Sequence, residues 1–437
     1  MTTARENEVL TRVGPGTPMG ALMREYWMPV GYSSEIKPDG NPVRIMALGE
    51  QLIAFRDSSG RVGIMDHRCP HRCASLFYGR NEEGGIRCIY HGWKFDVHGN
   101  CLDQPNLPPH QDFKHKVKAK AYKATERYGL LWLYMGDRAK APPFPDFELN
   151  DLKEGEITLS IIQQEYNWLQ GLENDLDTSH FGFLHLGAVD PATLAPPVTH
   201  YYLSKDRAPQ FHIEDTPLGL MYGAYRPADE ANTHWRLAQF ITPFWVIPPV
   251  TMMVDQIVMK GYIPMDDTHT LVITIQRLGF GRQPSPVPGL GKAFPSEDEF
   301  RPNTTDWFGR WRVNANPEND YLIDRGLQRD GNIFSGIDGL AMQDNAIGGT
   351  MGSINDRTFE HLSPADEMIA RMRRKMLKLV QAFQKDKSTP LPGVDNPSVY
   401  RGHRAGNFIA PNGKPFREAY EDLLRRHSNV APQWAAE

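Results

Sequence analysis

The sequence is poor in the features that mark several common protein classes. Its 437 residues include only four cysteines, too few for a disulfide scaffold. The longest apolar run, residues 244–254, is interrupted by Pro248 and Pro249, so we expect no helix that spans a membrane. Residues 1–30 contain no apolar stretch typical of a signal peptide, which favours a cytoplasmic location. The formal net charge of −5 gives no basic excess, and we expect no nucleic-acid partner.

The arrangement of apolar runs divides the chain into a lead-in and two domains. Residues 1–26 look helical around Pro18–Tyr26. Residues 27–145 contain short alternating runs separated by turn signals, which predict a small antiparallel β domain ending in a proline-rich segment. Residues 146–437 mix helices with long strands. We therefore predict an α+β protein, in a chain long enough to bury a sizeable core.

Two of the four cysteines stand in short pairs with histidines, as Cys69-x-His71 and Cys88-x-x-His91. Common zinc motifs pair like with like, whereas each of these pairs mixes a thiol with an imidazole. The mixture is typical of a Rieske [2Fe–2S] cluster, in which two histidines replace two cysteines on one iron. We predict that the two cysteines bind one iron and the two histidines the other. A zinc knuckle is the alternative.

The other two cysteines, Cys73 and Cys101, complete no metal motif. A second thiol pair close to a Rieske cluster can form a disulfide. However, Tyr90 occupies the position before His91, so the cysteine-rich second loop of the respiratory type is absent. We expect two free thiols that pack as small buried hydrophobic residues.

A second group of ligand-type residues follows Glu173, in the segment ENDLDTSHFGFLH. His180 and His185 are five residues apart, which in a regular α-helix would direct the two rings to different sides. A π-turn or a break in the helix would bring them together. Ordinary core or surface histidines are the alternative, but a chain with a one-electron cluster and no second redox centre would be only an electron carrier.

An open non-haem iron site needs two histidines and one carboxylate. The third ligand must come from elsewhere in the chain, and we favour Asp344 over Asp338 and Asp356, although composition alone leaves all three open. Asp177 precedes His180 by three residues and could accept the second N–H of its imidazole. Asn174 is a further polar neighbour that could point at the iron.

The chain as a whole resembles the Rieske non-haem iron ring-hydroxylating oxygenases, and more narrowly the α subunits of the phthalate dioxygenase subgroup. The segments MREYWMPV, CPHR…CIYHGWKFD, LENDLDTSHFGFLH and MQDNAIGGTMGSINDRTFEHLSPAD carry the resemblance. Cys73 is a departure, because the family commonly has glycine there. The resemblance implies a Rieske domain followed by a helix-grip (START-like) catalytic domain with an antiparallel sheet, and Asp344 as the third iron ligand.

The resemblance also implies how the protein works. A separate FMN/[2Fe–2S] reductase would pass electrons from NADH to the cluster. The mononuclear Fe(II) would use O₂ to convert an aromatic carboxylate, chlorobenzoate- or phthalate-like, to a cis-dihydrodiol. Homotrimers or stacked hexamers are implied, with Asp177 linking His180 to His91 of a neighbouring subunit. The alternatives are a Rieske monooxygenase that demethylates aromatic acids or cleaves aryl ethers, and a Rieske electron carrier without catalysis.

A substrate carboxylate calls for an arginine, since a guanidinium can bind both of its oxygens. Arg207, Arg226 and Arg236 are the candidates, and Arg207, with Ser179 as helper, best resembles the phthalate-type anchor. Residues 239–254, where the subgroup would place a second cation, have no basic side chain. We therefore expect a monocarboxylate, such as a meta-substituted or chlorinated benzoate. Phe244 could pack on its ring, with a place in the core as the alternative.

Overall fold

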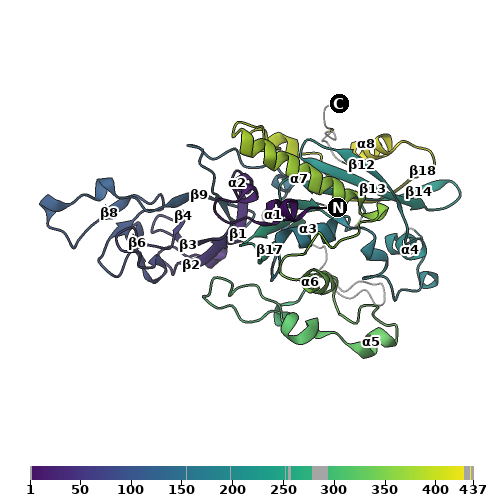
Figure 1. Ribbon diagram of the computed structural model, residues 1–437, viewed down its shortest axis with the longest axis horizontal. Helices are drawn as coiled ribbons and strands as arrows, with labels where there is room; N and C mark the ends of the chain where they lie inside the picture. Colours follow the sequence, from purple (N-terminus) through teal and green to yellow (C-terminus); the bar gives the residue numbers. More distant parts are fainter. Residues whose placement is uncertain are drawn as a thin grey trace.

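The protein is described from a computed structural model (Figure 1), which covers residues 2–153, 155–196, 198–250, 252–253, 257–277, 294–427 and 434. The picture separates two regions, with strands β2 to β8 at one end of the molecule and the larger sheet with most helices at the other. No helix among the described residues is long and apolar enough to cross a membrane.

The N-terminal region contains two antiparallel sheets. The larger has the order β1-β10-β9-β4-β3-β2, and the smaller has the order β5-β6-β7-β8. The strands are β1 (Met28–Tyr32), β2 (Val43–Ala47), β3 (Glu50–Arg56), β4 (Val62–Asp66), β5 (Arg80–Glu82), β6 (Gly85–Arg87), β7 (Lys94–Phe95), β8 (Cys101–Asp103), β9 (Ala121–Arg127) and β10 (Leu130–Tyr134). The predicted β domain is therefore present, and a hydrophobic cluster of its own contains Cys69 and Cys88.

The C-terminal region is built on an eight-stranded antiparallel sheet. Its order is β11-β17-β16-β15-β14-β13-β12, and β18 also pairs with β14. The strands are β11 (Ile157–Gln164), β12 (Gln210–Asp215), β13 (Gly219–Pro227), β14 (Asn232–Ile241), β15 (Trp245–Ile247), β16 (Val258–Pro264), β17 (Thr270–Arg277) and β18 (Gly406–Pro411). The α+β class with an antiparallel catalytic-domain sheet is thus confirmed.

Helices cover this sheet and bring the site residues to it. They are α1 (Ala4–Thr11), α2 (Pro18–Met23), α3 (Trp168–Leu176), α4 (Thr199–Lys205), α5 (Arg325–Arg329), α6 (Leu340–Thr350), α7 (Glu367–Lys385) and α8 (Phe416–His427). The long helix α7 packs on β13, and α3 packs on β16 and on α6. Methionines four residues apart, Met368, Met372 and Met376, are buried on one face of α7, which explains its close fit to the core.

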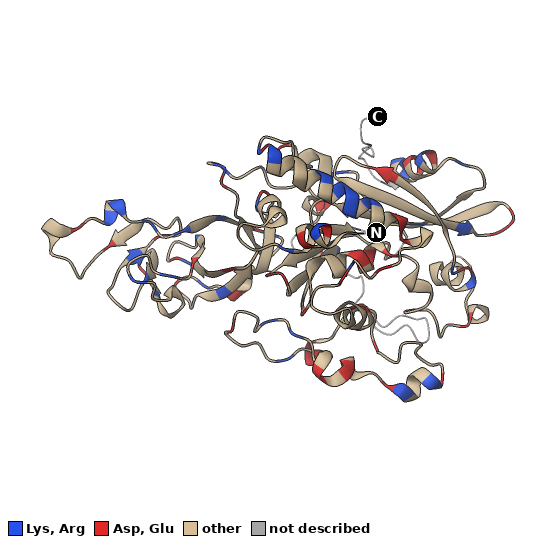
Figure 2. Cartoon of the chain, viewed as in Figure 1, with Lys and Arg blue, Asp and Glu red and all other residues tan. Residues whose placement is uncertain are grey.

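Several lysine and arginine residues lie along α7 (Figure 2), and not all of them face solvent. Arg373 is buried, and it and Arg357 both bind the carboxylate of Glu173 on α3. Arg373 also pairs with Glu360. Burial by itself would raise the pKa of Glu173, but the two arginines outweigh it and hold the pKa below its usual value. This buried ion cluster joins α3 to α7.

Candidate active site

The loops at the tip of the N-terminal region bring the four predicted cluster ligands together. Cys69 and Cys88 are buried in the cluster core, and the backbone N–H groups of His71 and Arg72 donate to the Cys69 sulfur. Burial and the neighbouring Cys88 raise the pKa of the Cys69 thiol to about 12. A thiol in such a place ionises only when a metal offsets the charge, so the pocket suits thiolates bound to iron.

The two histidine rings at this tip are held by aromatic neighbours. Their centroids lie 4.5 Å apart, and the His71 ring stacks on Trp93 at 4.3 Å. His91 packs against Tyr90, and its buried Nδ1 has no hydrogen-bond partner among the described residues. Burial lowers the pKa of His71, and the nearby His91 ring lowers it further. Both effects favour the neutral imidazole that a metal needs. The donor set therefore fits a [2Fe–2S] cluster with two cysteine and two histidine ligands.

The remaining two cysteines are free thiols, as expected. Cys101 is buried, but Cys73 is exposed, so the expectation of burial was wrong for Cys73. Its backbone has a φ of +60°, and its N–H donates to the carbonyl of Cys69. This left-handed conformation, which closes the first ligand loop, is one that glycine adopts without strain.

The second group of ligand-type residues converges where α3 ends. The helix stops at Leu176, Asp177 caps it in an extended conformation, and a 3-10 turn, His180–Gly182, follows. A helix break therefore brings the two histidines together, with 3.1 Å between the Nε2 atoms of His180 and His185. Asp177 does not share a helical face with His180, because the helix has ended before either residue.

Helix α6 supplies the carboxylate that completes this group. Asp344 Oδ1 lies 3.2 Å from His185 Nε2 and 3.6 Å from His180 Nε2, and it has no hydrogen-bond partner among the described residues. Burial alone would raise the pKa of Asp344, but His185 and His180 lower it to about 2. Three converging donor atoms of this kind form a two-histidine, one-carboxylate site that fits non-haem iron.

Neighbouring polar groups orient these ligands. His185 Nδ1 donates to Gln343 Oε1 at 2.6 Å, and the Gln343 amide is held by the carbonyl of Ile337 at 2.8 Å. Asp177 Oδ2 lies 3.6 Å from His180 Nδ1, and Asp177 Oδ1 accepts the backbone N–H of Ser179 at 2.7 Å. Each imidazole thus keeps Nε2 directed at the common centre.

A cavity of about 150 Å³ opens beside the triad. Its polar wall includes Asp175, His200, Arg236 and Lys260, and its apolar wall includes Phe181 and Leu340. A larger hollow of about 840 Å³, lined by Tyr32 and Trp311 among others, shares Gln276 and Phe294 with this cavity but includes none of the triad. The cavity next to the triad is therefore the candidate substrate site.

Several predicted substrate residues lie outside the lining of this cavity. Arg207 is half-buried with its guanidinium 5.1 Å from the Phe183 ring, and Ser179 contributes a backbone N–H to Asp177 instead. Phe244 is fully buried in the main hydrophobic cluster, because it belongs to the packing between sheet and helices, so its assignment to the substrate is corrected. Asn174 donates to the backbone carbonyl of Asp344 at 3.3 Å and braces α6, also outside the lining.

The sequence analysis missed several residues of the site, among them Gln343, Lys260 and His200. Gln343 was missed although it directly precedes Asp344, since a glutamine carries no ligand signal. Lys260, whose Nζ lies 2.9 Å from Asp175 Oδ2, and His200 come from segments without a motif. Arg236 was considered but not preferred.

Comparisons with known proteins agree with this geometry. Residues 26–120 match the family model described as Rieske [2Fe-2S] domain, and residues 133–420 match the one described as LigXa C-terminal domain like. Among curated proteins, the chain is 43% identical to the 3-chlorobenzoate-3,4-dioxygenase oxygenase subunit of Comamonas testosteroni over 97% of this chain and 99% of that protein. It is 37% identical to the phthalate 4,5-dioxygenase oxygenase subunit of Pseudomonas putida, covering 89% and 88% of the two chains.

A demethylase is also similar. The chain is 32% identical to the 5,5'-dehydrodivanillate O-demethylase oxygenase subunit of a Sphingobium strain, over 94% of this chain and 91% of that protein. Among solved structures, dicamba monooxygenase bound to dicamba matches with a TM-score of 0.56 at 17% identity, covering 83% of this chain and 99% of that chain. At that identity the likeness concerns the fold alone.

Proposed function

The chain belongs to the Rieske non-haem iron aromatic ring oxygenases, and we propose that it cis-dihydroxylates an aromatic monocarboxylate such as a chlorobenzoate. It acts as the oxygenase subunit of a system that needs a reductase partner. The observation that carries the proposal is the presence in one chain of a cysteine–histidine cluster site and of a His₂Asp triad beside a cavity.

The Rieske cluster and the mononuclear iron are the cofactors of this family, and we assign their ligands as follows. Cys69, His71, Cys88 and His91 would hold the cluster, and the triad His180, His185 and Asp344 would hold the iron. When bound, the two groups supply single electrons and the activation of O₂. The orphaned His91 Nδ1 and Asp344 Oδ1 support this assignment.

The chain's own residues prepare the site. Gln343 holds the Nδ1 proton of His185, and Asp177 faces Nδ1 of His180. The apolar wall with Phe181 and Leu340 excludes water around the substrate ring. Ligand geometry is thereby set before substrate enters.

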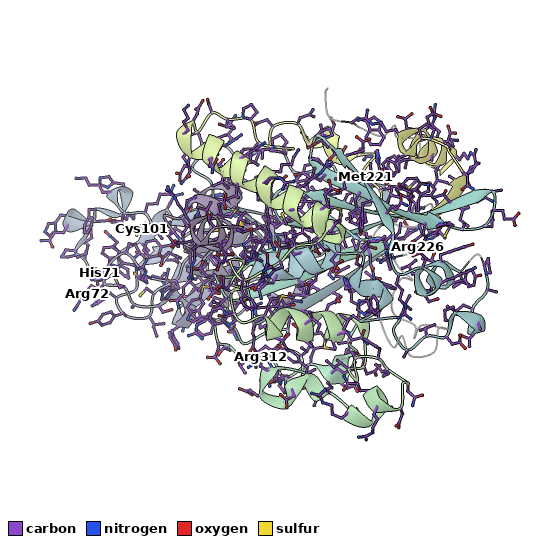
Figure 3. The ribbon with its side chains drawn as sticks, turned by 45° about the vertical axis from the view of Figure 1, so that its right-hand side comes forward. His71, Arg72, Cys101, Met221, Arg226 and Arg312 are labelled. Carbon is purple, nitrogen blue, oxygen red and sulfur yellow. The ribbon has the colours of Figure 1, made fainter. Side chains whose placement is uncertain are left out.

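We further propose that electrons cross between subunits of a head-to-tail homotrimer, single or stacked into a hexamer, with Asp177 linking His180 to His91 of the next subunit. Figure 3 shows His71 at one end of the molecule and Arg226 of β13, in the catalytic-domain sheet, toward the other, and this separation supports transfer from another chain. The proposed donor is an FMN/[2Fe–2S] reductase that takes electrons from NADH, and we accordingly propose a cytoplasmic location.

The test is O₂ uptake coupled to NADH with a reductase of that type, across benzoate, 3-chlorobenzoate, phthalate, terephthalate and vanillate, with products identified by mass. We expect a dihydrodiol from a monocarboxylate. A dihydrodiol from phthalate alone would contradict the monocarboxylate assignment and keep the reaction.

The second candidate function is a monooxygenase that demethylates aromatic acids, favoured by the similarity to the dehydrodivanillate demethylase. Formaldehyde released from vanillate would establish it. A carrier without catalysis predicts no iron at the triad and no substrate-dependent O₂ uptake, so the same assay with iron analysis decides against it.

A further inference from the structure

One arginine of the catalytic domain, Arg236, is buried against the candidate substrate cavity and forms no ion pair with the acidic residues that the structure describes. Arg236 lies in the middle of β14, paired across the sheet with Ala224 on β13 and Asn407 on β18. Its side chain is 7% exposed and lines the cavity that contains the triad. By its position in the sequence, Arg207 was preferred to Arg236 as the carboxylate anchor.

The guanidinium of Arg236 is held in a fixed orientation. Nε donates to Thr178 Oγ1 at 2.9 Å, and Nη1 donates to the carbonyl of Pro249 at 2.9 Å. Its carbon lies 4.4 Å from the centroid of the Phe181 ring. These contacts hold a planar donor group in place, and such a pre-oriented group loses little entropy when it binds an anion.

The acids around the cavity are all engaged elsewhere. Asp344 belongs to the triad, and Asp177 is held by Ser179 and His180. Asp175 is paired with Lys260 at 2.9 Å and accepts a hydrogen bond from Tyr262 at 2.6 Å. Among the described residues, Arg236 therefore has no carboxylate as a direct partner. Its two hydrogen bonds, to Thr178 and Pro249, are both to neutral groups.

Arg236 is thus a buried cation at the cavity without a direct ion pair among the described residues, although Asp175 acts on it from a distance. Burial lowers the pKa of Arg236 to about 10, so the group is still protonated at neutral pH. Burial, with Arg236 nearby, lowers the pKa of His200 to about 4, so that imidazole is neutral. A buried cation of this kind is stabilised by a ligand that brings the missing negative charge.

The rival arginines lack this placement. Arg207 is outside the cavity lining, beside the Phe183 ring. Arg226 is buried on the same sheet but lies beside His234, with 3.5 Å between Nη1 and Nδ1, and it too is outside the lining.

We propose that Arg236 is the specificity-determining residue that binds the carboxylate of the aromatic substrate and turns its ring toward the triad. The inference rests on the proposed function and names the group that selects its substrate. Because Lys260 is already neutralised by Asp175, the cavity accommodates one carboxylate, and a second would compete with Asp175.

Binding measured without turnover tests this proposal. Isothermal titration calorimetry on the holoenzyme under anaerobic conditions compares 3-chlorobenzoate with its neutral analogue 3-chlorobenzamide. For the unaltered protein we expect the carboxylate to bind about tenfold more tightly than the amide. Equal affinities would overturn the proposal without any variant, so the test does not depend on how a substituted protein folds.

Variants locate the effect. In Arg236→Gln we expect the Kd of 3-chlorobenzoate to rise about 100-fold, and in Arg236→Lys about tenfold because the charge remains without the planar group. Binding of 3-chlorobenzamide should change less than about threefold in both. Arg207→Met tests the alternative anchor. A loss of carboxylate affinity in Arg207→Met but not in Arg236→Gln would overturn the assignment.

The outcomes separate this inference from the proposed function. If the unaltered protein hydroxylates 3-chlorobenzoate and Arg236→Gln binds it equally well, the anchor is wrong and the function stands. If the carboxylate binds through Arg236 but yields neither dihydrodiol nor O₂ uptake, the anchor stands and the proposed function is wrong.

Discussion

At the scale of single residues, the iron site depends on a hydrogen bond from a ligand to a glutamine. His185 Nδ1 and Gln343 Oε1 are 2.6 Å apart, and the two residues lie 158 positions apart in the chain. The bond fixes the tautomer of the imidazole, so that Nε2 remains available as a donor to the metal.

Replacing Gln343 by leucine removes that bond. We expect Gln343→Leu to lower iron occupancy or activity about 10- to 100-fold, because a ligand without its orienting partner binds less well. The measurement is iron per subunit, with the visible absorbance of the Rieske cluster as the internal reference. Gln343→Glu keeps an acceptor and should retain more iron. Full iron occupancy in the leucine variant would show that the hydrogen bond is dispensable.

The left-handed backbone conformation of Cys73 gives a second prediction at the scale of single residues. It holds a φ of +60° beside the cluster ligands. We expect Cys73→Gly to be more stable than Cys73→Ala by about 1 kcal/mol, because only glycine relieves the left-handed conformation. Both variants remove the exposed thiol, so the comparison isolates the backbone. Thermal bleaching of the cluster absorbance measures it, and identical midpoints would contradict the argument.

At the scale of elements, α3 joins the core to the metal site. Its residue Glu173 binds Arg357 and Arg373 inside the protein, while the end of the same helix leads into His180. The ion cluster at Glu173 therefore fixes the position of α3, and with it the segment that contains His180.

We expect Glu173→Gln to destabilise the protein by about 3–5 kcal/mol, since two buried guanidinium groups lose their counter-charge. The control is Lys375→Met on the same helix α7. It removes a pair with the exposed Asp215 of β12 and should cost less than about 1 kcal/mol. Urea denaturation measures both. Equal effects would mean that burial adds nothing to the interaction.

The same residue predicts a pH dependence. The folded-state pKa of Glu173 lies below its ordinary value of 4.5, so its stabilising contribution is complete above pH 4.5. It is lost as the pH falls through the folded-state pKa. The stability difference between the unaltered protein and Glu173→Gln should therefore be constant near neutral pH and shrink below pH 4.5. A difference that grows on acidification would reverse the sign and contradict the ion-cluster explanation.

Asp175 on α3 sets the charge of the cavity. Asp175→Asn should free Lys260 and give the site a second available cation. We expect the affinity for phthalate relative to 3-chlorobenzoate to rise by roughly tenfold, because a second carboxylate then finds a partner. Calorimetry with both ligands measures the ratio. Asp175→Glu keeps the pairing and should leave the ratio unchanged, and a similar ratio in all three proteins would contradict this role of Lys260.

At the scale of the whole molecule, strands β6 and β8 beside the cluster loops lie at one end of the molecule, whereas α3 and α6 lie in the larger region with the main sheet (Figure 1). The tip exposes Ile89 and Tyr90, the two residues between the proposed cluster ligands Cys88 and His91. Exposed apolar side chains next to a redox centre are suited to contact with another protein surface.

Subunit mixing tests whether electrons cross between chains. A variant without the cluster, Cys69→Ala, and a variant without the triad, His180→Ala, should each be inactive. Co-expression in one assembly should restore substrate-dependent O₂ uptake, because an intact cluster then faces an intact triad of its neighbour. Co-expression that remains inactive, in assemblies shown to contain both chains, would place the working pair within one subunit.

Much of this organisation could be predicted from contiguous residues. The β domain, the cysteine–histidine pairs of the proposed cluster site and the pair His180 and His185 follow from short motifs, since the spacing and chemistry of such residues are local properties. The boundaries at residues 26 and 145 stay predictions. A shared hydrophobic cluster contains both Trp132 and Trp245, so packing by itself draws no line there.

The sequence by itself therefore determined the metals, the α+β fold and the reaction class, because these depend on residue types at short, fixed separations. Only the tertiary structure decided what surrounds the iron. It brought Asp344 rather than Asp338 or Asp356 to the histidines, and it placed Arg236 rather than Arg207 in the cavity wall. The physical reason is that burial and partner choice arise from strands and helices distant in sequence, and no local pattern records which side of a sheet faces the substrate.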